Sequence, residues 1–352
     1  MHLKFNKIAS LFIIVFSLYS CEQDIAVMQD YVYSPTTYQL DVPYGFPSPN
    51  IPNDNPMTEE AVELGKKLFY DPVLSNNNTH SCASCHFQSK GFSDPNQFSI
   101  GVNGIAGDKN ASALINLAWN NFNFWDGRVL SLEEQALDPI TNELELHSSW
   151  TEVVNRIKEN DQYKELFFMA FNTTNFDSTH VVKAIAQFER TLISGDSKFD
   201  KYIRNEVNLE VSELRGLEIF NSEKGDCFHC HSYPLFASNE FHNNGIDPEL
   251  LMDNGRMNVT GEPFDKGKFK SPTLRNIELT APYMHDGRFQ TLEEVIEHYD
   301  FGGHNSSTID PLMKKVGIGL GLNNQEKSDL IQFLKTLTDT SFIFNKNFKP
   351  NN

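Results

Sequence analysis

Four of the five cysteines form two copies of one short pattern, C-x-x-C-H: Cys82, Cys85 and His86, then Cys227, Cys230 and His231. Two thiols at this spacing can form thioethers with the two vinyl groups of one porphyrin, and the adjacent histidine can ligate the iron. A zinc site, two disulfides or a redox-active cysteine pair would also use the cysteines, but none of these needs a histidine in both copies. The pattern therefore predicts two covalently bound haem c groups, with His86 and His231 as axial iron ligands.

The fifth cysteine, Cys21, ends an apolar stretch at the N-terminus. Lys4 and Lys7 precede the apolar run at 8–18, which has the length of a secretory signal and is too short to span a bilayer. A small residue followed by cysteine is similar to a bacterial lipoprotein signal, although an ordinary signal peptide or a buried helix would also be apolar. We expect cleavage after residues 1–20, a lipid on Cys21, and an exported protein of the periplasm or cell envelope whose only membrane attachment is that lipid.

Composition and charge exclude some classes of function. The chain has 352 residues, 39% of them hydrophobic and 22% charged, which is a globular composition long enough for about two domains. Asp and Glu number 47 against 29 Lys and Arg, so the formal net charge is −18. A nucleic-acid binder needs a basic face, so we expect no nucleic-acid partner. An acidic surface instead favours a basic protein partner.

The chain repeats part of itself after each C-x-x-C-H. Residues 126–134 (DGRVLSLEE) match 286–294 (DGRFQTLEE), which suggests two copies of one unit. In each copy Ser131 or Thr291 stands three residues before a glutamate, which predicts a capping box and a helix start. Apolar residues at helical spacing predict three further helices, over 58–69, 178–193 and 326–338.

These patterns predict a mainly α fold. No sustained alternation of apolar and polar residues indicates a large sheet. We expect two cytochrome c-like haem domains, related by the internal repeat and surrounded by long loops. The boundaries we expect are a signal peptide at 1–20, a tether and N-terminal wrap at 21–55, a first domain at 56–205 and a second domain at 206–345.

The ligand on the second face of each iron decides what a haem can do. Two strong ligands favour electron transfer, whereas an open face can bind peroxide or oxygen. No histidine or methionine lies between His86 and His147, so no nearby loop residue of these types blocks the first iron. After His231 the residues alone do not choose among the candidate second ligands: His242, Met252, Met257, Met284, His285, His298, Tyr299, His304 and Met313.

Further stretches, in order across 56–340, resemble the bacterial dihaem cytochrome c peroxidase and MauG family. They are 64–69 (LGKKLF), 124–128 (FWDGR), 132–136 (LEEQA), 271–276 (SPTLRN), 280–287 (TAPYMHDG) and 297–299 (EHY). Many short matches in the same order are a more specific signal than a single motif. The resemblance implies that the haem on His86 is peroxidatic and that the haem on His231 transfers electrons.

The resemblance also implies roles for single residues. Trp125 matches the tryptophan between the two haems, Gln135 matches a distal-pocket glutamine, and Glu145 matches an acid–base glutamate. From the residues alone, Trp125 is equally a core aromatic and Glu145 a surface carboxylate. Three positions match the oxygen ligands of an interdomain calcium ion: Asn110, Thr280 and Pro282.

Two departures from the better-known peroxidases matter for function. The loop histidine that blocks the first iron in many of them is absent, and the position of the methionine on the second haem is Tyr299. A tyrosine there resembles the MauG type, in which an oxyanion ligand lowers the haem potential. If Tyr299 is only a packed helix residue, Met284 is the substitute ligand.

Three functions remain open from the sequence. The first is a peroxidase that reduces hydrogen peroxide at the first haem, with electrons entering through the second haem from a small cytochrome c or cupredoxin. The second is a MauG-like enzyme that uses a bis-ferryl state to oxidise Trp or Tyr side chains of a partner protein. The third is a dihaem electron-transfer cytochrome without catalysis. Gln135, Glu145 and the absent blocking histidine count against the third.

Overall fold

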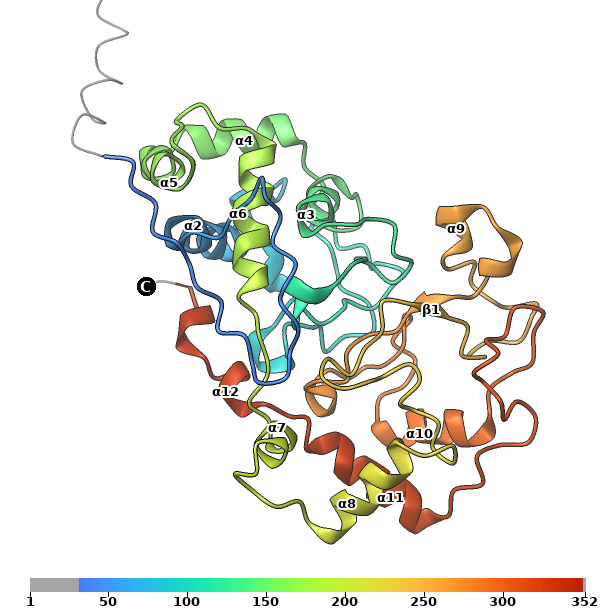
Figure 1. The fold of residues 1–352 in the computed structure, drawn as a ribbon. Helices are drawn as coiled ribbons and strands as arrows, with labels where there is room; N and C mark the ends of the chain where they lie inside the picture. Colours follow the sequence, from blue (N-terminus) through green and yellow to red (C-terminus); the bar gives the residue numbers. More distant parts are fainter. Residues whose placement is uncertain (1–31, 351–352) are drawn as a thin grey trace, which may run out of the picture.

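The computed structural model describes residues 32–350, which form a mainly helical protein (Figure 1). The expectation of a mainly α fold is confirmed, since the one sheet in this range is an antiparallel pair of β1 (Phe241–His242) and β2 (Phe269–Lys270). Cys21 and the expected signal peptide lie outside the described residues. Within 32–350, no helix is both long enough and apolar enough to cross a membrane.

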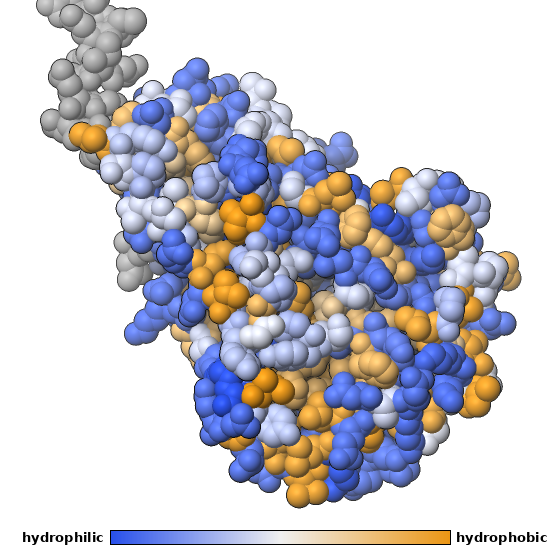
Figure 2. Space-filling model, in the orientation of Figure 1, coloured by the Kyte–Doolittle hydropathy of each residue, from blue (hydrophilic) through white to orange (hydrophobic). Residues whose placement is uncertain are grey.

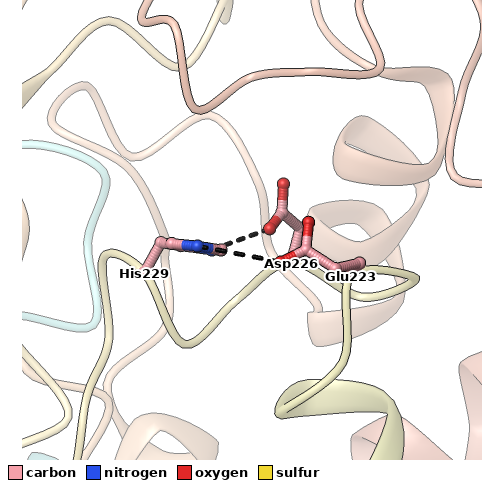
Figure 3. Close-up of side chains that lie close together, drawn as sticks. All are labelled: Glu223, Asp226 and His229. Carbon is pink, nitrogen blue, oxygen red and sulfur yellow. Dashed lines mark ion pairs between the residues drawn. The ribbon is translucent and has the colours of Figure 1, made fainter.

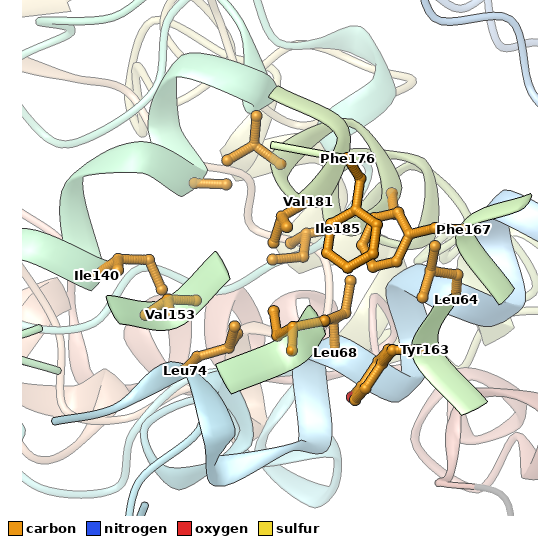
Figure 4. Packing of buried hydrophobic residues seen from close by; sticks show 14 of the residues in the cluster. Leu64, Leu68, Leu74, Ile140, Val153, Tyr163, Phe167, Phe176, Val181 and Ile185 are labelled. Atoms are coloured by element: carbon orange, nitrogen blue, oxygen red, sulfur yellow. The ribbon is translucent and has the colours of Figure 1, made fainter. Parts of the chain in front are cut away.

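Five helices surround the first C-x-x-C-H: α2 (Glu59–Tyr70), α3 (Leu132–Thr141), α4 (Trp150–Lys158), α5 (Asp161–Phe171) and α6 (Ser178–Arg190). The helices expected over 58–69 and 178–193 are confirmed as α2 and α6, with ends that differ by at most three residues. The buried apolar residues of these helices, together with Phe176 from the loop before α6, form a continuous core (Figure 4) that includes Leu64, Leu68, Phe167 and Ile185. This core holds the segment that carries the first motif.

The crossing of α2 and α6 requires a glycine. A Cβ atom at Gly65 would lie 1.9 Å from the backbone oxygen of Ala184, so any side chain would force the helices apart. A second helix pair, α8 (Val211–Phe220) and α11 (Asn324–Lys335), crosses in the same way beside the second motif. There a Cβ atom at Gly216 would lie 2.0 Å from the backbone oxygen of Asp329. The helix expected over 326–338 is thus confirmed as α11, starting two residues earlier.

The two Ser/Thr-x-x-Glu sites begin helices as expected, but only one is a complete capping box. Thr291 caps α10 (Leu292–Phe301), and the Glu294 carboxylate accepts the Thr291 amide at 3.0 Å. Ser131 caps α3 and accepts the Glu134 amide at 3.1 Å. The Glu134 carboxylate instead accepts a hydrogen bond from the backbone N–H of Leu130, at 3.0 Å. The prediction that it would accept from the N–H of Ser131 is therefore wrong by one residue.

Both ends of the described chain run back over the helices around the first motif (Figure 1). In the N-terminal segment, the Pro47 carbonyl accepts the indole N–H of Trp119 at 2.8 Å, in keeping with a wrap. At the C-terminus, Phe342 and Phe348 pack edge-on against Phe92. The chain leaves the surroundings of the second motif before it ends, so these last aromatic residues complete the core beside the first motif.

The other helical segments are short, and most of them shape the loops around the two motifs. The α-helical ones are α7 (Lys198–Ile203), α9 (Met257–Thr260) and α12 (Thr340–Ile343). The 3-10 segments are η1 (Pro72–Leu74), η2 (Cys82–Ser84), η3 (Gln88–Lys90), η4 (Leu117–Trp119), η5 (Pro263–Asp265), η6 (Ile277–Leu279) and η7 (Lys346–Phe348). On the face seen in Figure 2, hydrophobic residues gather only in small separate groups among hydrophilic ones.

Candidate functional site

An interior cavity of about 600 Å³ reaches both C-x-x-C-H motifs. All six motif residues line it. The same cavity is lined by the residues to which the resemblance gave roles at the two haems and the calcium ion: Asn110, Trp125, Gln135, Glu145, Thr280, Pro282 and Tyr299. The fold therefore brings together, in one space, groups that lie more than 200 residues apart in sequence.

The two motif histidines have the same surroundings. The Nδ1 of His86 lies 2.8 Å from the carbonyl oxygen of Phe92, and the Nδ1 of His231 lies 3.1 Å from that of Phe236. An Nδ1–H that donates to a carbonyl leaves Nε2 with its lone pair, which is the arrangement of an axial metal ligand. Burial lowers the pKa of both rings, that of His231 to about 4, so both are neutral and able to ligate iron.

The cysteines fit thioether attachment better than the alternatives. None of the four described cysteines is in a disulfide. Burial raises the pKa of Cys85 to about 11 and that of Cys227 and Cys230 to about 12, so these thiols are protonated at neutral pH. Within residues 32–350 the cysteines also do not come close enough to share one metal ion. Two neutral thiols beside each ligating histidine suit two haem c groups.

A cluster of Glu223, Asp226 and His229 braces the loop of the second motif (Figure 3). His229 stands between the two cysteines, and its Nδ1 lies 2.8 Å from an Asp226 carboxylate oxygen. The Lys314 ammonium lies 2.7 Å from Glu223 and 3.4 Å from Asp226. Lys314 thus supplies the positive charge that balances these carboxylates, and the ion pairs hold the loop of the second motif in place.

Glu145 is held in the turn that follows α3. Its backbone N–H donates to the carbonyl of Asn142, and the Asn142 side-chain amide donates to Glu145 Oε1 at 2.8 Å. Burial, and then the negative charge of Asp138, raise the pKa of the Glu145 carboxyl. Gln135 lies on α3 and faces the same cavity. The sequence reasoning missed Asn142, whose only signal is its place three residues before Glu145.

Trp125 connects the surroundings of the two motifs. Its indole Nε1–H donates to the carbonyl of Asn110 at 2.8 Å. Its own carbonyl accepts the backbone N–H of Lys270, also at 2.8 Å, and Lys270 belongs to the strand pair beside the second motif. Because hydrogen bonds hold Trp125 from both sides, its position between these two segments is fixed, and its place between two haems stays a prediction.

The three expected calcium ligands lie at this same junction. The side-chain amide of Asn110 donates to the carbonyls of Asn96 and Gln97 at 3.1 and 3.2 Å, which leaves its Oδ1 as the ligand atom. The Asn110 backbone N–H donates to the carbonyl of His285 at 2.8 Å. Asn110 is thereby tied to the segment that carries Thr280 and Pro282. A set of neutral oxygens suits calcium, and the ion itself stays a prediction.

Asn244 lies close to both candidate ligands for the second haem. The side-chain Nδ2 of Asn244 lies 3.3 Å from the Tyr299 hydroxyl oxygen and 3.6 Å from the Met284 sulfur. Burial raises the pKa of Tyr299 to about 12. The sequence reasoning missed Asn244, which lies in a loop 55 residues before Tyr299 and carries no motif. The identity of the ligand stays a prediction.

Glu189, on α6, is a buried carboxyl that no sequence pattern marked. Its Oε2 is buried without a hydrogen-bond partner among the described residues. The neighbouring Arg190 is paired instead with Glu133, at 2.8 Å. Burial raises the pKa of Glu189 to about 8, so the carboxyl is mostly protonated at neutral pH. It lines the cavity near Cys82.

Comparison with known proteins identifies the family. The family model described as "Di-haem cytochrome c peroxidase" matches residues 59–208. The methylamine utilization protein MauG of Methylorubrum extorquens is 36% identical over 81% of this chain and 80% of its own length. The cytochrome c551 peroxidase of Nitrosomonas europaea is 38% identical over 80% of this chain and 81% of its own.

A solved structure agrees with these sequence relatives. The crystal structure of a MauG-like protein associated with microbial copper homeostasis superposes with a TM-score of 0.82, at 37% identity over 89% of this chain and 99% of that one. The relatives include both peroxidases and MauG proteins. The chain therefore belongs to the dihaem cytochrome c peroxidase and MauG family.

Proposed function

We propose that this protein reduces hydrogen peroxide at a haem attached through Cys82, Cys85 and His86. The observation that carries the proposal is the Glu145 carboxyl, which is buried in the cavity beside this motif and oriented by Asn142. A carboxyl whose pKa is raised toward the working pH can both accept and donate a proton during one turnover. An electron-transfer cytochrome would have no need of such a group.

The chain's own residues supply proton transfer and positioning. When bound, the haem supplies the iron and the redox chemistry. Glu145 Oε1 is held by Asn142, so Oε2 is the oxygen that takes a proton from hydrogen peroxide and returns it to the leaving oxygen. The Gln135 amide holds the peroxide in the cavity. With two further protons and two electrons, peroxide leaves as two molecules of water.

The electrons enter at the second motif. Trp125 lies between the two motifs, with hydrogen bonds to both sides, and is the relay that we propose for the electrons. The donor we expect is a small cytochrome c or cupredoxin. We also infer two cytochrome c-like domains, at 56–205 and 206–345, a calcium ion at the junction, and a location in the periplasm or cell envelope with a lipid on Cys21.

A second function is favoured by Tyr299. Its hydroxyl lines the cavity of the second motif, within reach of the Asn244 amide. A tyrosinate ligand would lower the potential of that haem, so that it could store an oxidising equivalent. The protein would then oxidise Trp or Tyr side chains of a partner protein, as a MauG-like enzyme.

The test compares two glutamates on the same turn. Glu145→Gln removes the proton-transfer group and keeps the bond from Asn142, whereas Glu143→Gln changes an exposed carboxyl two residues away. We expect the rate of the peroxide reaction, measured by stopped-flow absorbance, to fall by about 10²–10⁴-fold in Glu145→Gln only. Equal rates in both variants and the wild type would refute the role of Glu145.

One titration separates the two candidate functions. The fully oxidised, haem-loaded protein receives one equivalent of hydrogen peroxide without reductant. A rapid spectral change in both haems supports the MauG-like function. A response only after one haem is reduced supports the peroxidase that draws electrons from a small donor.

A further inference from the structure

Lys270 is a lysine beside the second motif that the proposed peroxide chemistry does not use. It is the last residue of β2, and its backbone N–H donates to the Trp125 carbonyl at 2.8 Å. The next residue, Ser271, donates its hydroxyl to the carbonyl of Cys230 at 2.9 Å. Lys270 is therefore fixed between Trp125 and the second motif, at the junction of the two haem sites.

The Lys270 ammonium has no partner within residues 32–350. Protein surrounds the side chain, yet it keeps intermediate accessibility because it lines the interior cavity. Burial alone lowers its pKa to about 8, and no described carboxylate lies close enough to oppose this. Lys268, two residues earlier, shows the ordinary case, because its ammonium lies 3.1 Å from the Asp265 carboxylate.

An unpaired ammonium inside a protein is expensive. Removal of a charge from water is unfavourable unless an opposite charge lies next to it. Among residues 32–350, no group supplies that charge to Lys270. The two haems would supply this negative charge. Each haem carries two propionate carboxylates, and the two haems would flank the junction where Lys270 lies.

We propose that Lys270 forms an ion pair with a haem propionate at the junction between the two haems and that its positive charge raises the reduction potential of that haem. The propionate belongs to either haem, and the experiment distinguishes them. A cation near the iron favours the ferrous state, which carries one positive charge fewer than the ferric state. The proposal needs the two haems but no peroxide chemistry, so it stands or falls independently of the proposed function.

The test measures both haem potentials by spectroelectrochemistry in the haem-loaded protein, without peroxide. Lys270→Gln keeps much of the side-chain length and removes the charge, Lys270→Arg keeps the charge, and Lys268→Gln removes a charge from the same strand region. We expect a lower potential for at least one haem in Lys270→Gln, a value nearer to the wild type in Lys270→Arg, and no shift in Lys268→Gln. The haem whose potential falls is the owner of the propionate. Unchanged potentials in Lys270→Gln overturn the proposal.

A crystal structure of the haem-loaded wild type tests the same point without a variant. We expect a propionate oxygen within about 4 Å of the Lys270 ammonium nitrogen, the usual limit for an ion pair. A Lys270 ammonium that contacts only water or a carboxylate of the chain overturns the proposal, even if Lys270→Gln fails to incorporate haem.

Discussion

Replacement of Arg275 by methionine tests how the fold holds the second motif. Arg275 is fully buried, and its guanidinium makes a bidentate pair with Asp200 of α7, at 2.8 and 2.9 Å. It also donates two hydrogen bonds to the carbonyl of Pro234, at 2.9 and 2.5 Å. Pro234 lies between His231 and Phe236, whose carbonyl accepts from His231. Methionine fills much of the same volume and makes none of these bonds.

The expected loss follows from what the substitution leaves behind. Asp200 is 4% exposed, and without Arg275 its carboxylate keeps only the bonds from Ser197. Burial by itself would raise the pKa of Asp200, but the hydrogen bonds and charge of Arg275 outweigh burial and hold the pKa below its usual value. Removal of one partner of a buried pair costs about 3–5 kcal/mol. We expect a loss of this size, with reduced occupancy of the second haem.

The assay is urea unfolding of the haem-loaded soluble chain at neutral pH. Arg204→Met is the control, because the carboxylates that pair with Arg204, those of Asp196 and Glu206, are both about half exposed, and such pairs contribute about 0–1 kcal/mol. Adding Asp200→Asn to Arg275→Met should recover part of the loss, since it removes the uncompensated charge. A loss in Arg275→Met no larger than in the control would refute this account of the second motif.

Three further predictions follow from the cavity. Burial raises the pKa of Glu145, and its carboxylate form accepts the proton from peroxide. The rate of the peroxide reaction should therefore fall as the pH drops through a value above the pKa of an ordinary glutamate. Stopped-flow rates of Glu145→Gln should not show this fall at low pH. The pKa of Glu189 in the folded chain is about 8, above that of a glutamate in the unfolded chain. The contribution of Glu189 to the free energy of unfolding is therefore complete below its unfolded-state pKa and is lost as pH rises through about 8. Glu189→Gln should therefore gain stability over the wild type between about pH 5 and about pH 8, and a difference independent of pH in urea titrations would contradict an unpartnered carboxyl. Finally, a calcium chelator should alter the haem spectrum of the wild type and leave that of Asn110→Ala unchanged, whereas equal responses would argue against a calcium ion at Asn110.

The helices could be predicted where local pattern and packing agree. The apolar faces of α2, α6 and α11 repeat at helical spacing and are the faces that the structure buries. Sequence reasoning did not propose α4, α5 or α8, although α4 has an apolar face and a complete capping box. The close crossings at Gly65 and Gly216 also escaped prediction, because a glycine inside a helix carries no mark of what will pack against it.

Some residues of the candidate site could also be predicted from the sequence, and others could not. Residues within a covalent motif could be named from spacing alone, because the thioether chemistry of haem dictates it. Glu145, Gln135 and Trp125 were named through resemblance, and the structure places all three on the cavity. Asn142, Asn244, Glu189 and Lys270 were missed, because their significance depends on what they face and not on their neighbours in the chain.

By itself, the sequence predicted two haem attachments, and it determined the mainly helical fold and the places where several helices begin. These features depend on residues close together in the chain. Only the tertiary structure decided which polar groups are left without partners in the cavity, and that the chain's last aromatic residues complete the core beside the first motif. Burial by the surrounding segments sets the ionisation of Glu189 and Lys270. Both depend on segments that meet only when the chain has folded.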